Sequence, residues 1–377
     1  MIGSAEECDV KIHGHRISAR HFVLFKINQT RPATQEEYEQ SGQTKKTSHL
    51  VYLQEISGHG TFVNGQLCKR NETVLLQDND LISLGSNGPS WFFRSTDRKG
   101  NKSFDERFKV TKTLGKGHFA EVFEAVERCT NAKFAAKMIK KRMVNDDKAF
   151  LHEIGLLMSC THPLITCIRD VFDDGNVIYL LLELAQGGEL FDRIIQRGKF
   201  TEKETRYVFR QLFSALEYLH ASSIVHRDIK PENILLCKPD SFDIRLADFG
   251  LAKIIGSRSI TSSLAGTPSY IPPEMLAPPN SNKGVEYTRK VDSWSAGVVL
   301  YICLCGFPPF SQELAPPDMK TQIREGRFQF TRPYWDSVSN GAIDLISKLL
   351  TVDPEHRLSI SEAARHPWML ADDDASA

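Results

Sequence analysis

The chain lacks an excess of either charge, since its 377 residues include 47 lysines and arginines and 47 aspartates and glutamates. A net charge of zero argues against nucleic acid as a direct partner. The chain also lacks an apolar run near the ~20 residues that a membrane helix needs. Its first ten residues, MIGSAEECDV, contain neither the basic nor the apolar region of a secretory signal. These absences predict a soluble intracellular protein that contacts neither nucleic acid nor membrane.

Cysteine is scarce and scattered, with eight residues in the whole chain. Cys303 and Cys305 lie in an apolar run, and no second pair of Cys or His stands at zinc-ligand spacing. We therefore interpret them as small buried hydrophobes, and we expect reduced thiols. The length predicts two or three domains.

The first part of the sequence, residues 1–94, is rich in short β-forming runs that are separated by turn residues. Asn64-Gly65 is typical of a type I′ hairpin. Residues 28–48 are polar without an apolar period, and we predict a mobile loop there. This pattern predicts an all-β sandwich, followed by a linker over 95–107. Strands are expected over 10–12, 21–27, 49–55, 61–63, 73–76, 81–84 and 91–93.

A second domain begins at residue 108 with a glycine-rich stretch, Leu114–Val122, between strand-like runs. Such a hairpin can place backbone N–H groups over phosphates. Lys137 is embedded in the apolar strand 134–139, where a charge needs a partner. Glu153 lies beside the apolar stripe of the next helix and is the candidate partner.

The polar stretch around residues 226–233 lies between two apolar runs, 224–225 and 234–236. Burial of both runs would hold Asp228, Lys230 and Asn233 at fixed positions. A second apolar run ends at Asp248, and pairing of the two runs would bring Asp248 to the same place. Carboxylate and amide oxygens favour Mg²⁺, which binds few protein ligands together with substrate phosphates. This pattern predicts phosphoryl transfer.

The remainder of the chain is mostly helical. Residues 251–274 are rich in hydroxyl groups and predict a segment that phosphorylation could order. The last residues, 369–377, form an acidic tail. Apolar periodicity predicts helices over 202–220, 291–305, 342–350 and 360–364.

The set His226-Arg227-Asp228, Asn233 and Asp248-Phe249-Gly250 resembles the catalytic loop and the metal-binding motif of protein kinases. The resemblance implies a two-lobed α+β kinase fold over 108–368, with a small lobe at 108–184 and a large lobe at 185–368.

The resemblance also assigns roles to these side chains. It implies that Asp228 orients the substrate hydroxyl and accepts its proton, and that Lys230 steadies the transferred phosphoryl group. Asn233 and Asp248 would hold Mg²⁺, while Glu153 would orient Lys137 onto ATP. The implied ATP contacts are Leu114, Gly115, Lys116, Gly117, His118, Phe119, Ala120, Glu121, Val122, Lys137, Glu183, Leu184, Glu189, Leu235 and Asp248.

Further family positions concern control and support. Ser263 and Thr267 match activating phosphorylation sites, and Arg227 would receive the added phosphate. Asp292 resembles the residue that holds the catalytic-loop backbone. Glu274 is expected to pair with a buried Arg357. Two positions depart from the family: Ala120 replaces a glycine, and Pro273 replaces an alanine.

Residues 1–94 resemble a forkhead-associated domain, a class that binds phosphothreonine peptides. The resemblance rests on Ile2-Gly3, on Ile17-Ser18-x-x-His21-Phe22 and on Ser57–Gly65. Ser18 matches the family's phosphate-binding serine, and Arg20 could add a charge. However, Ser4 and His59 stand where the family has a phosphate-binding Arg and an Asn. Weak phosphopeptide binding and a purely structural or dimerisation role both remain open.

The order of the two domains resembles checkpoint effector kinases of the checkpoint kinase 2 type. This implies a nuclear serine/threonine kinase in DNA-damage signalling, phosphothreonine protein partners and a transient homodimer. Glu189 and Glu232 resemble acidic positions that recognise an Arg preceding the target residue. The alternatives are an inactive kinase-like scaffold and a phosphopeptide reader whose kinase part is secondary.

Overall fold

The computed structural model divides into two compact units, which we describe separately. The first unit comprises residues Met1–Thr161 and Cys167–Leu184, and the second comprises His162–Thr166 together with the described residues after Leu184. The structure describes residues 1–14, 17–85, 88–94, 102–116, 120–141, 147–248, 268–276 and 289–371.

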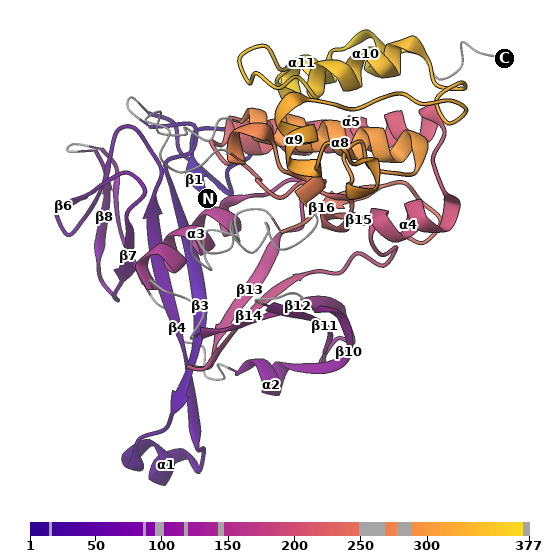
Figure 1. The fold of residues 1–377 in the computed structure, drawn as a ribbon. Coiled ribbons are helices and arrows are strands. Elements are labelled where there is room, and N and C mark those ends of the chain that lie inside the picture. Colours follow the sequence, from indigo (N-terminus) through magenta and orange to yellow (C-terminus); the bar gives the residue numbers. More distant parts are fainter. Residues whose placement is uncertain are drawn as a thin grey trace. The chain divides into compact units, whose positions relative to one another are not determined.

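The N-terminal part of the first unit is the predicted β-sandwich (Figure 1). Three of its strands, β5, β7 and β8, begin and end at the predicted residues, because turn residues delimit them in the sequence. Asn64 and Gly65 have positive φ values of 51° and 79°, as a type I′ turn requires. Its elements are β1 (Ile2–Gly3), β2 (Val10–Lys11), β3 (Phe22–Pro32), α1 (Gln35–Ser41), β4 (Lys45–Glu55), β5 (Thr61–Val63), β6 (Gln66–Cys68), β7 (Thr73–Leu76), β8 (Leu81–Leu84) and β9 (Ser90–Phe92).

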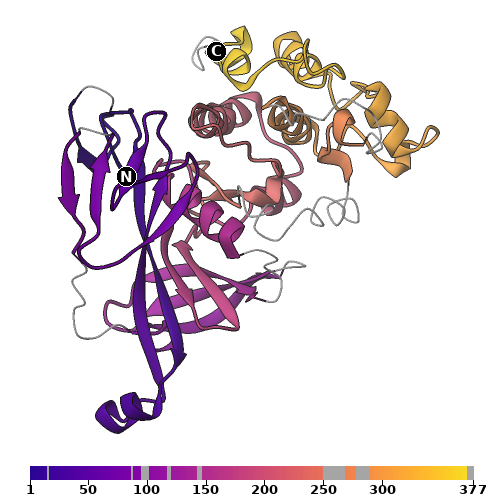
Figure 2. The same cartoon turned by 90° about the vertical axis from the view of Figure 1, so that its left-hand side faces the viewer.

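The prediction of a mobile loop over residues 28–48 is wrong. Strands β3 and β4 continue as a long two-stranded ribbon, and α1 lies at its tip (Figure 2). The ribbon has no apolar period because it projects beyond the sandwich core. It is held instead by Thr30 Oγ1 against Thr47 Oγ1 at 3.0 Å and by a capping box that joins Thr34 and Glu37 at the start of α1.

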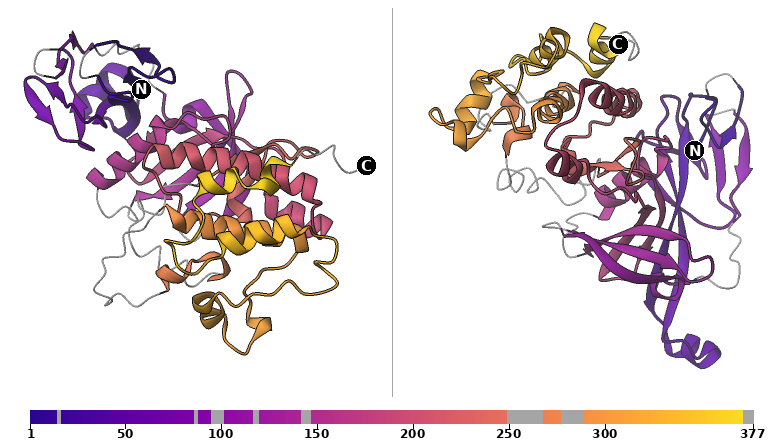
Figure 3. Two further views of the ribbon diagram at one scale, coloured as in Figure 1. Left: turned by 90° about the horizontal axis from the view of Figure 1, so that it is seen from above. Right: turned by 90° about the vertical axis from the view of Figure 1, so that its right-hand side faces the viewer.

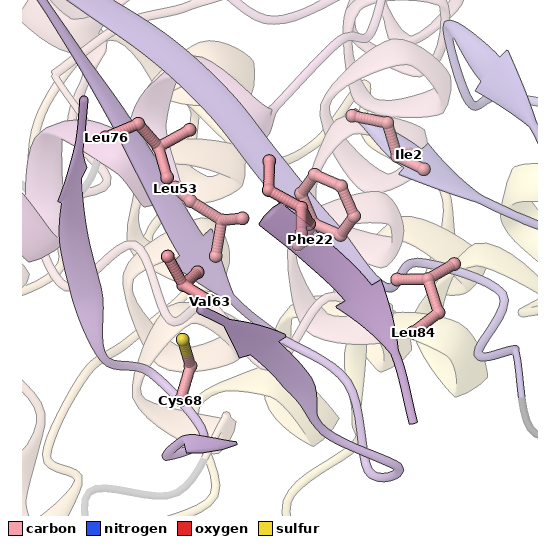
Figure 4. Packing of buried hydrophobic residues seen from close by; sticks show 8 residues of the cluster. Ile2, Phe22, Leu53, Val63, Cys68, Leu76 and Leu84 are labelled. Carbon is pink, nitrogen blue, oxygen red and sulfur yellow. The ribbon is translucent and has the colours of Figure 1, made fainter. Parts of the chain in front are cut away.

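The core of the sandwich lies between two sheets (Figure 4). One sheet contains β1, β2, β3, β4 and β7, and the other has the order β6-β5-β8-β9. Alternating residues of these strands point inward, as expected for sheets with one buried face. The buried cluster consists of Ile2, Phe22, Leu53, Val63, Cys68, Leu76, Ile82 and Leu84.

The rest of the first unit is a five-stranded antiparallel arrangement with one long helix. Its strand order is β10-β11-β12-β14-β13, and β13 pairs in parallel with β3 of the sandwich. The two predicted domains therefore share one continuous sheet within the first unit. The elements are α2 (Phe104–Arg107), β10 (Phe108–Lys116), β11 (Ala120–Glu127), β12 (Lys133–Lys140), α3 (Asp147–Ser159), β13 (Ile168–Asp173) and β14 (Val177–Glu183).

The predicted linker over 95–107 needs correction at its end, whereas residues 95–101 lie outside the described part. Helix α2 occupies 104–107, and Phe104 is buried in the same core as Phe108 and Phe172. Its ring stacks on Tyr179 at a centroid distance of 4.1 Å. This aromatic packing makes the segment part of the domain that follows.

The second unit is mainly helical, and the predicted helices at 202–220, 291–305, 342–350 and 360–364 are confirmed within one or two residues. Helix α8 is almost fully buried and packs on α5 and α10 (Figure 3). A helix that is apolar on all sides belongs in such a central position. The elements are α4 (Leu190–Arg197), α5 (Glu202–Ala221), η2 (Pro231–Asn233), β15 (Ile234–Leu236), β16 (Ile244–Leu246), η3 (Pro268–Tyr270), η4 (Pro273–Met275), α8 (Lys290–Cys305), η5 (Gln312–Leu314), α9 (Met319–Glu325), α10 (Asn340–Leu349), α11 (Ile360–Ala364) and α12 (Pro367–Leu370).

Cys303 and Cys305 lie on α8 and are buried, as interpreted from the sequence. Burial raises the pKa of the Cys305 thiol to about 12. Among the described helices, none combines the length and the apolar character needed to cross a membrane.

Candidate active site

The catalytic-loop residues come together around the Asp228 carboxylate in the second unit. Lys230 Nζ lies 2.8 Å from Asp228 Oδ2, and Asn233 Nδ2 donates to the same oxygen at 2.8 Å. Asn233 Nδ2 also donates to the Asp228 carbonyl at 2.7 Å. Burial alone would lower the pKa of Lys230, but the charge of Asp228 and its hydrogen bond outweigh burial and raise that pKa. Lys230 therefore remains a cation beside a carboxylate of fixed orientation.

Burial on both sides holds this loop in place. Ile229 and Ile234 are buried, and β15 pairs with β16 in the predicted antiparallel hairpin. The Ala247 N–H donates to the Asn233 carbonyl at 2.9 Å and so ties the two strands together just before Asp248. Asp248 itself has a φ of 64°, a left-handed conformation that is uncommon for a residue with a side chain. The sequence thus predicted the convergence of these residues but not the backbone strain.

Asp292 holds the backbone of the catalytic loop through hydrogen bonds, as the family resemblance implied. Its carboxylate is fully buried and accepts the backbone N–H groups of His226 at 2.9 Å and Arg227 at 2.8 Å. Arg227 has a φ of 68°, which this pair of hydrogen bonds stabilises. Burial opposes ionisation of Asp292, but the hydrogen bond and charge of His220 and the bond from Arg227 lower the pKa of this carboxyl.

Lys137, Glu153 and the glycine-rich stretch belong to the first unit. Lys137 is 8% exposed on β12 and is aligned with Val122 of β11 and Leu180 of β14. Glu153 is 6% exposed on α3. Two charged side chains at this depth need partners, and the predicted Lys137–Glu153 pair remains a prediction.

The glycine-rich stretch forms a hairpin of β10 and β11 in which Gly115 pairs with Val122 and Lys116 with Glu121. Ala120 begins β11, and Leu114 is exposed on β10. The central residues Gly117, His118 and Phe119 lie outside the described part. The hairpin confirms a strand after the glycines and rules out the helix that a Rossmann fingerprint requires.

A family model of the protein kinase domain matches residues 108–369. The chain belongs to the protein kinase family. A second model, of the FHA (forkhead-associated) domain, matches residues 1–85. The chain therefore combines an FHA domain with a kinase domain, in the order that the sequence predicted.

Three relatives illustrate the similarity. The probable serine/threonine-protein kinase fhkC of Dictyostelium discoideum is 37% identical over 337 residues, which cover 86% of this chain and 56% of that protein. The DNA damage response protein kinase DUN1 of Saccharomyces cerevisiae is 43% identical over 301 residues, which cover 72% and 57%. The crystal structure of Rad53 1–466 in complex with AMP-PNP superposes with a TM-score of 0.62 at 30% identity, covering 98% of this chain and 90% of that one. The chain spans little more than half the length of fhkC and DUN1.

The kinase domain carries an acidic group next to its catalytic loop. Burial, followed by the negative charges of Asp192 and Glu232, raises the pKa of Glu189. Glu189 forms an isolated backbone bridge with Leu235. Oxygen Oε2 of Glu232 is buried without a hydrogen-bond partner among the described residues. An unmatched buried carboxylate oxygen favours a cationic ligand.

The structure describes the predicted Glu274–Arg357 pair but not the predicted phosphorylation sites. Glu274 and Arg357 form the expected pair, with Nη1–Oε1 and Nη2–Oε2 distances of 2.8 and 2.9 Å. Pro273, which replaces the family's alanine, is the first residue of η4 and is accommodated there. Ser263 and Thr267 lie outside the described residues.

The two candidate phosphopeptide residues of the FHA domain, Ser18 and Arg20, have different partners. Ser18 Oγ lies 3.1 Å from His59 Nδ1 and accepts the Gly58 N–H at 3.3 Å. Arg20 Nε donates to Glu7 at 3.3 Å, so its charge already has a carboxylate partner. The contribution of His59 was not predicted. The signal that could have indicated it is the position of His59, which stands where the family has a peptide-binding asparagine.

The catalytic-loop histidine should make the fold sensitive to mild acid. His226 Nδ1 accepts the Asp228 N–H at 3.2 Å, and Nε2 lies 2.9 Å from the Ala247 carbonyl, so the neutral ring fits both contacts. Burial lowers the pKa of His226. Between that lowered pKa and the ordinary value, the unfolded chain binds more protons. The free energy of unfolding should therefore fall by about 1 kcal/mol per pH unit as the pH drops through this window.

Urea unfolding between pH 7.5 and 5.5 tests this expectation. His226→Gln should flatten the pH dependence, because the amide does not titrate. His356→Gln serves as the matched control, since the His356 side chain is 80% exposed. An unchanged slope in His226→Gln would assign the acid sensitivity to other groups.

Proposed function

We propose that this chain is an ATP- and Mg²⁺-dependent serine/threonine protein kinase with a role in the DNA-damage response. The observation that carries the proposal is the Asp228 carboxylate, which Lys230 and Asn233 hold in one orientation on a buried loop. Family membership and the similarity to the DNA damage response protein kinase DUN1 support the same activity.

The residues present suit a bound magnesium ion. Asn233 directs its amide nitrogen to Asp228, which leaves its amide oxygen available as a ligand. Asp248 follows β16 and Asn233 precedes β15, so the antiparallel hairpin places the Asp248 carboxylate at the same end as Asn233. Hard oxygen donors of this kind are those that Mg²⁺ prefers. When bound, the ion would neutralise the phosphate charge. Asn233 and Asp248 would hold it.

The chain's own residues would carry the remaining steps. Asp228 would accept the hydrogen bond of the substrate hydroxyl and then its proton. Lys230, which the adjacent carboxylate keeps protonated, would steady the transferred phosphoryl group. Lys137, aligned by Glu153, would position the nucleotide phosphates.

The first assay uses radiolabelled ATP and a serine peptide with an arginine before the serine, and it is run before and after phosphatase treatment. Activity that falls on phosphatase treatment, with phosphate mapped to Ser263 or Thr267, would support control by the activation segment. Absence of turnover in both states would favour the scaffold alternative.

Glu189 and Glu232 should set the preference for arginine in the substrate. Replacing both residues by glutamine keeps their size and removes the two charges, and we expect kcat/KM for the arginine peptide to fall by about 10- to 100-fold. The matched measurement uses a peptide with alanine in place of arginine, for which the variant and wild type should differ little. Equal losses on both peptides would contradict a role in substrate recognition.

For the FHA domain we propose weak phosphothreonine binding through Ser18, with His59 as an additional contact. The weakness follows from the engagement of Arg20 with Glu7, since a free guanidinium is the strong phosphate ligand. Titration with phosphothreonine peptides tests this, and tight binding would contradict it. Nuclear residence and a transient homodimer remain predictions. Imaging of a tagged chain and analytical ultracentrifugation, respectively, would test them.

A further inference from the structure

The FHA domain contributes a strand pair to the sheet of the kinase domain. Within the first unit, β3 pairs in parallel with β13 through Asn28–Phe172 and Gln29–Asp173. Asn28 is only 1% exposed, and its Nδ2 donates to Asp170 Oδ1 at 2.6 Å and to the Val171 carbonyl at 2.9 Å. A buried amide with two partners fixes the register between the two strands.

The acceptor Asp170 is a buried carboxylate of the kinase domain whose cationic partners are partly exposed. Asp170 Oδ2 accepts from Arg107 Nη1 at 2.7 Å, and Lys26 of β3 lies 3.8 Å away. Arg107 also pairs with Glu127 at 2.9 Å. Contacts of this kind lose more on disruption than rim contacts do, because each leaves a buried charge without its partner.

A second contact joins the FHA domain to helix α3. Gln54 of β4 is fully buried, and its Nε2 donates to the His152 carbonyl at 2.9 Å and lies 2.6 Å from His152 Nδ1. His152 immediately precedes Glu153. Its carbonyl is a backbone group of α3, so the amide of Gln54 acts on the helix itself.

The helix has a glycine where the FHA domain approaches it. A Cβ at Gly155 would overlap Gln54 Oε1 and would lie 2.7 Å from Cε1 of Phe25 on β3. Glycine in a helix interior costs about 1 kcal/mol relative to alanine. A glycine is needed here because β3 and β4 approach the helix too closely for a side chain.

We propose that Gln54 is a positioning residue for phosphotransfer, which holds α3 so that Glu153 can align Lys137 on the nucleotide. The FHA domain is then a structural support of the kinase domain's nucleotide site as well as a recognition module. This inference rests on the proposed function. It names no contact between Gln54 and the nucleotide, because Gln54 acts through His152 and the helix.

The test uses full-length Gln54→Met, which keeps the length and packing of the side chain and removes the amide donor. We expect the Kd of a fluorescent ATP analogue and the KM for ATP to rise about tenfold, with a smaller change in kcat. Gln77→Met, an exposed glutamine of the same domain, is the matched control and should leave all three unchanged. An unchanged Kd and KM in a folded Gln54→Met protein would overturn the proposal.

A second variant approaches the same contact from the helix. Gly155→Ala should raise the KM for ATP although alanine favours helix formation, because its methyl group would push α3 away from Gln54 and Phe25. Full activity in Gly155→Ala would contradict the proposed close support.

The nucleotide titration separates the two proposals. A wild-type chain that does not phosphorylate peptides, but whose nucleotide Kd rises in Gln54→Met, would refute the proposed activity and support the positioning role. An active wild type with no response to Gln54→Met would do the reverse.

Discussion

Replacing Asp228 with asparagine is expected to reduce the rate of peptide phosphorylation by about 10³-fold, within the range that a positioned general base contributes. The substitution keeps the size of the side chain and removes its charge. The two neighbours that fix the carboxylate, Lys230 and Asn233, can still contact an amide oxygen. The loop should therefore keep its conformation, and the Kd for ATP should change by less than threefold.

The experiment measures kcat, the KM for ATP and nucleotide affinity in the same preparation. Asp240→Asn is the matched control, because Asp240 is exposed in the turn between β15 and β16. If Asp228→Asn retained near-wild-type kcat, Asp228 would not be the base. If nucleotide affinity collapsed with activity, the residue would act through loop structure instead.

Local chemistry explains how much of this site could be predicted. The apolar runs around the catalytic loop predicted the β15–β16 hairpin, and that pairing places Asn233, just before β15, and Asp248, just after β16, at the same end of the hairpin. Asp292 was identified from its family motif, and the structure shows why a carboxylate is needed: it accepts two backbone N–H groups that point the same way. The left-handed φ values of Arg227 and Asp248 could not be predicted, since arginine rarely adopts that conformation and aspartate, although enriched in it, adopts it in only a small minority of cases.

Long-range pairing explains what could not be predicted. The strands β3 and β13 are separated by well over a hundred residues, and only their pairing brings Asn28 to its partners on β13. Gln54 likewise finds its partner only where β4 meets α3. In sequence, Asn28 marked the start of a presumed loop. The T-x-x-E pattern at Thr34–Glu37 is a helix-start signal within that segment, but the loop prediction rested on the absence of an apolar period alone. Hydrophobic periodicity identifies elements that face a core and misses a ribbon that does not.

The largest expected effect on stability is at Arg357. Its side chain is completely buried, and its guanidinium donates to both oxygens of Glu274 and to the carbonyls of Thr351 at 2.9 Å and Lys290 at 2.9 Å. It also lies 5.1 Å from the ring centre of Trp294. Arg357→Ala would leave the carboxylate and the carbonyls without their donor. Breaking a buried pair in this way costs about 3–5 kcal/mol.

Urea unfolding followed by tryptophan fluorescence measures this loss directly, because three of the four tryptophans, Trp294, Trp335 and Trp368, belong to the second unit. Glu274→Gln also removes the counter-charge of the buried guanidinium, but it should cost less than Arg357→Ala, because the amide oxygen can still accept one bond and Arg357 keeps its carbonyl acceptors. Arg365→Ala, an exposed arginine near the same end of the chain, should change stability by less than about 0.5 kcal/mol. A loss below about 1 kcal/mol for Arg357→Ala would mean that water enters and replaces the lost donors, and that the pair contributes to conformation of the segment before α8 without stabilising the fold.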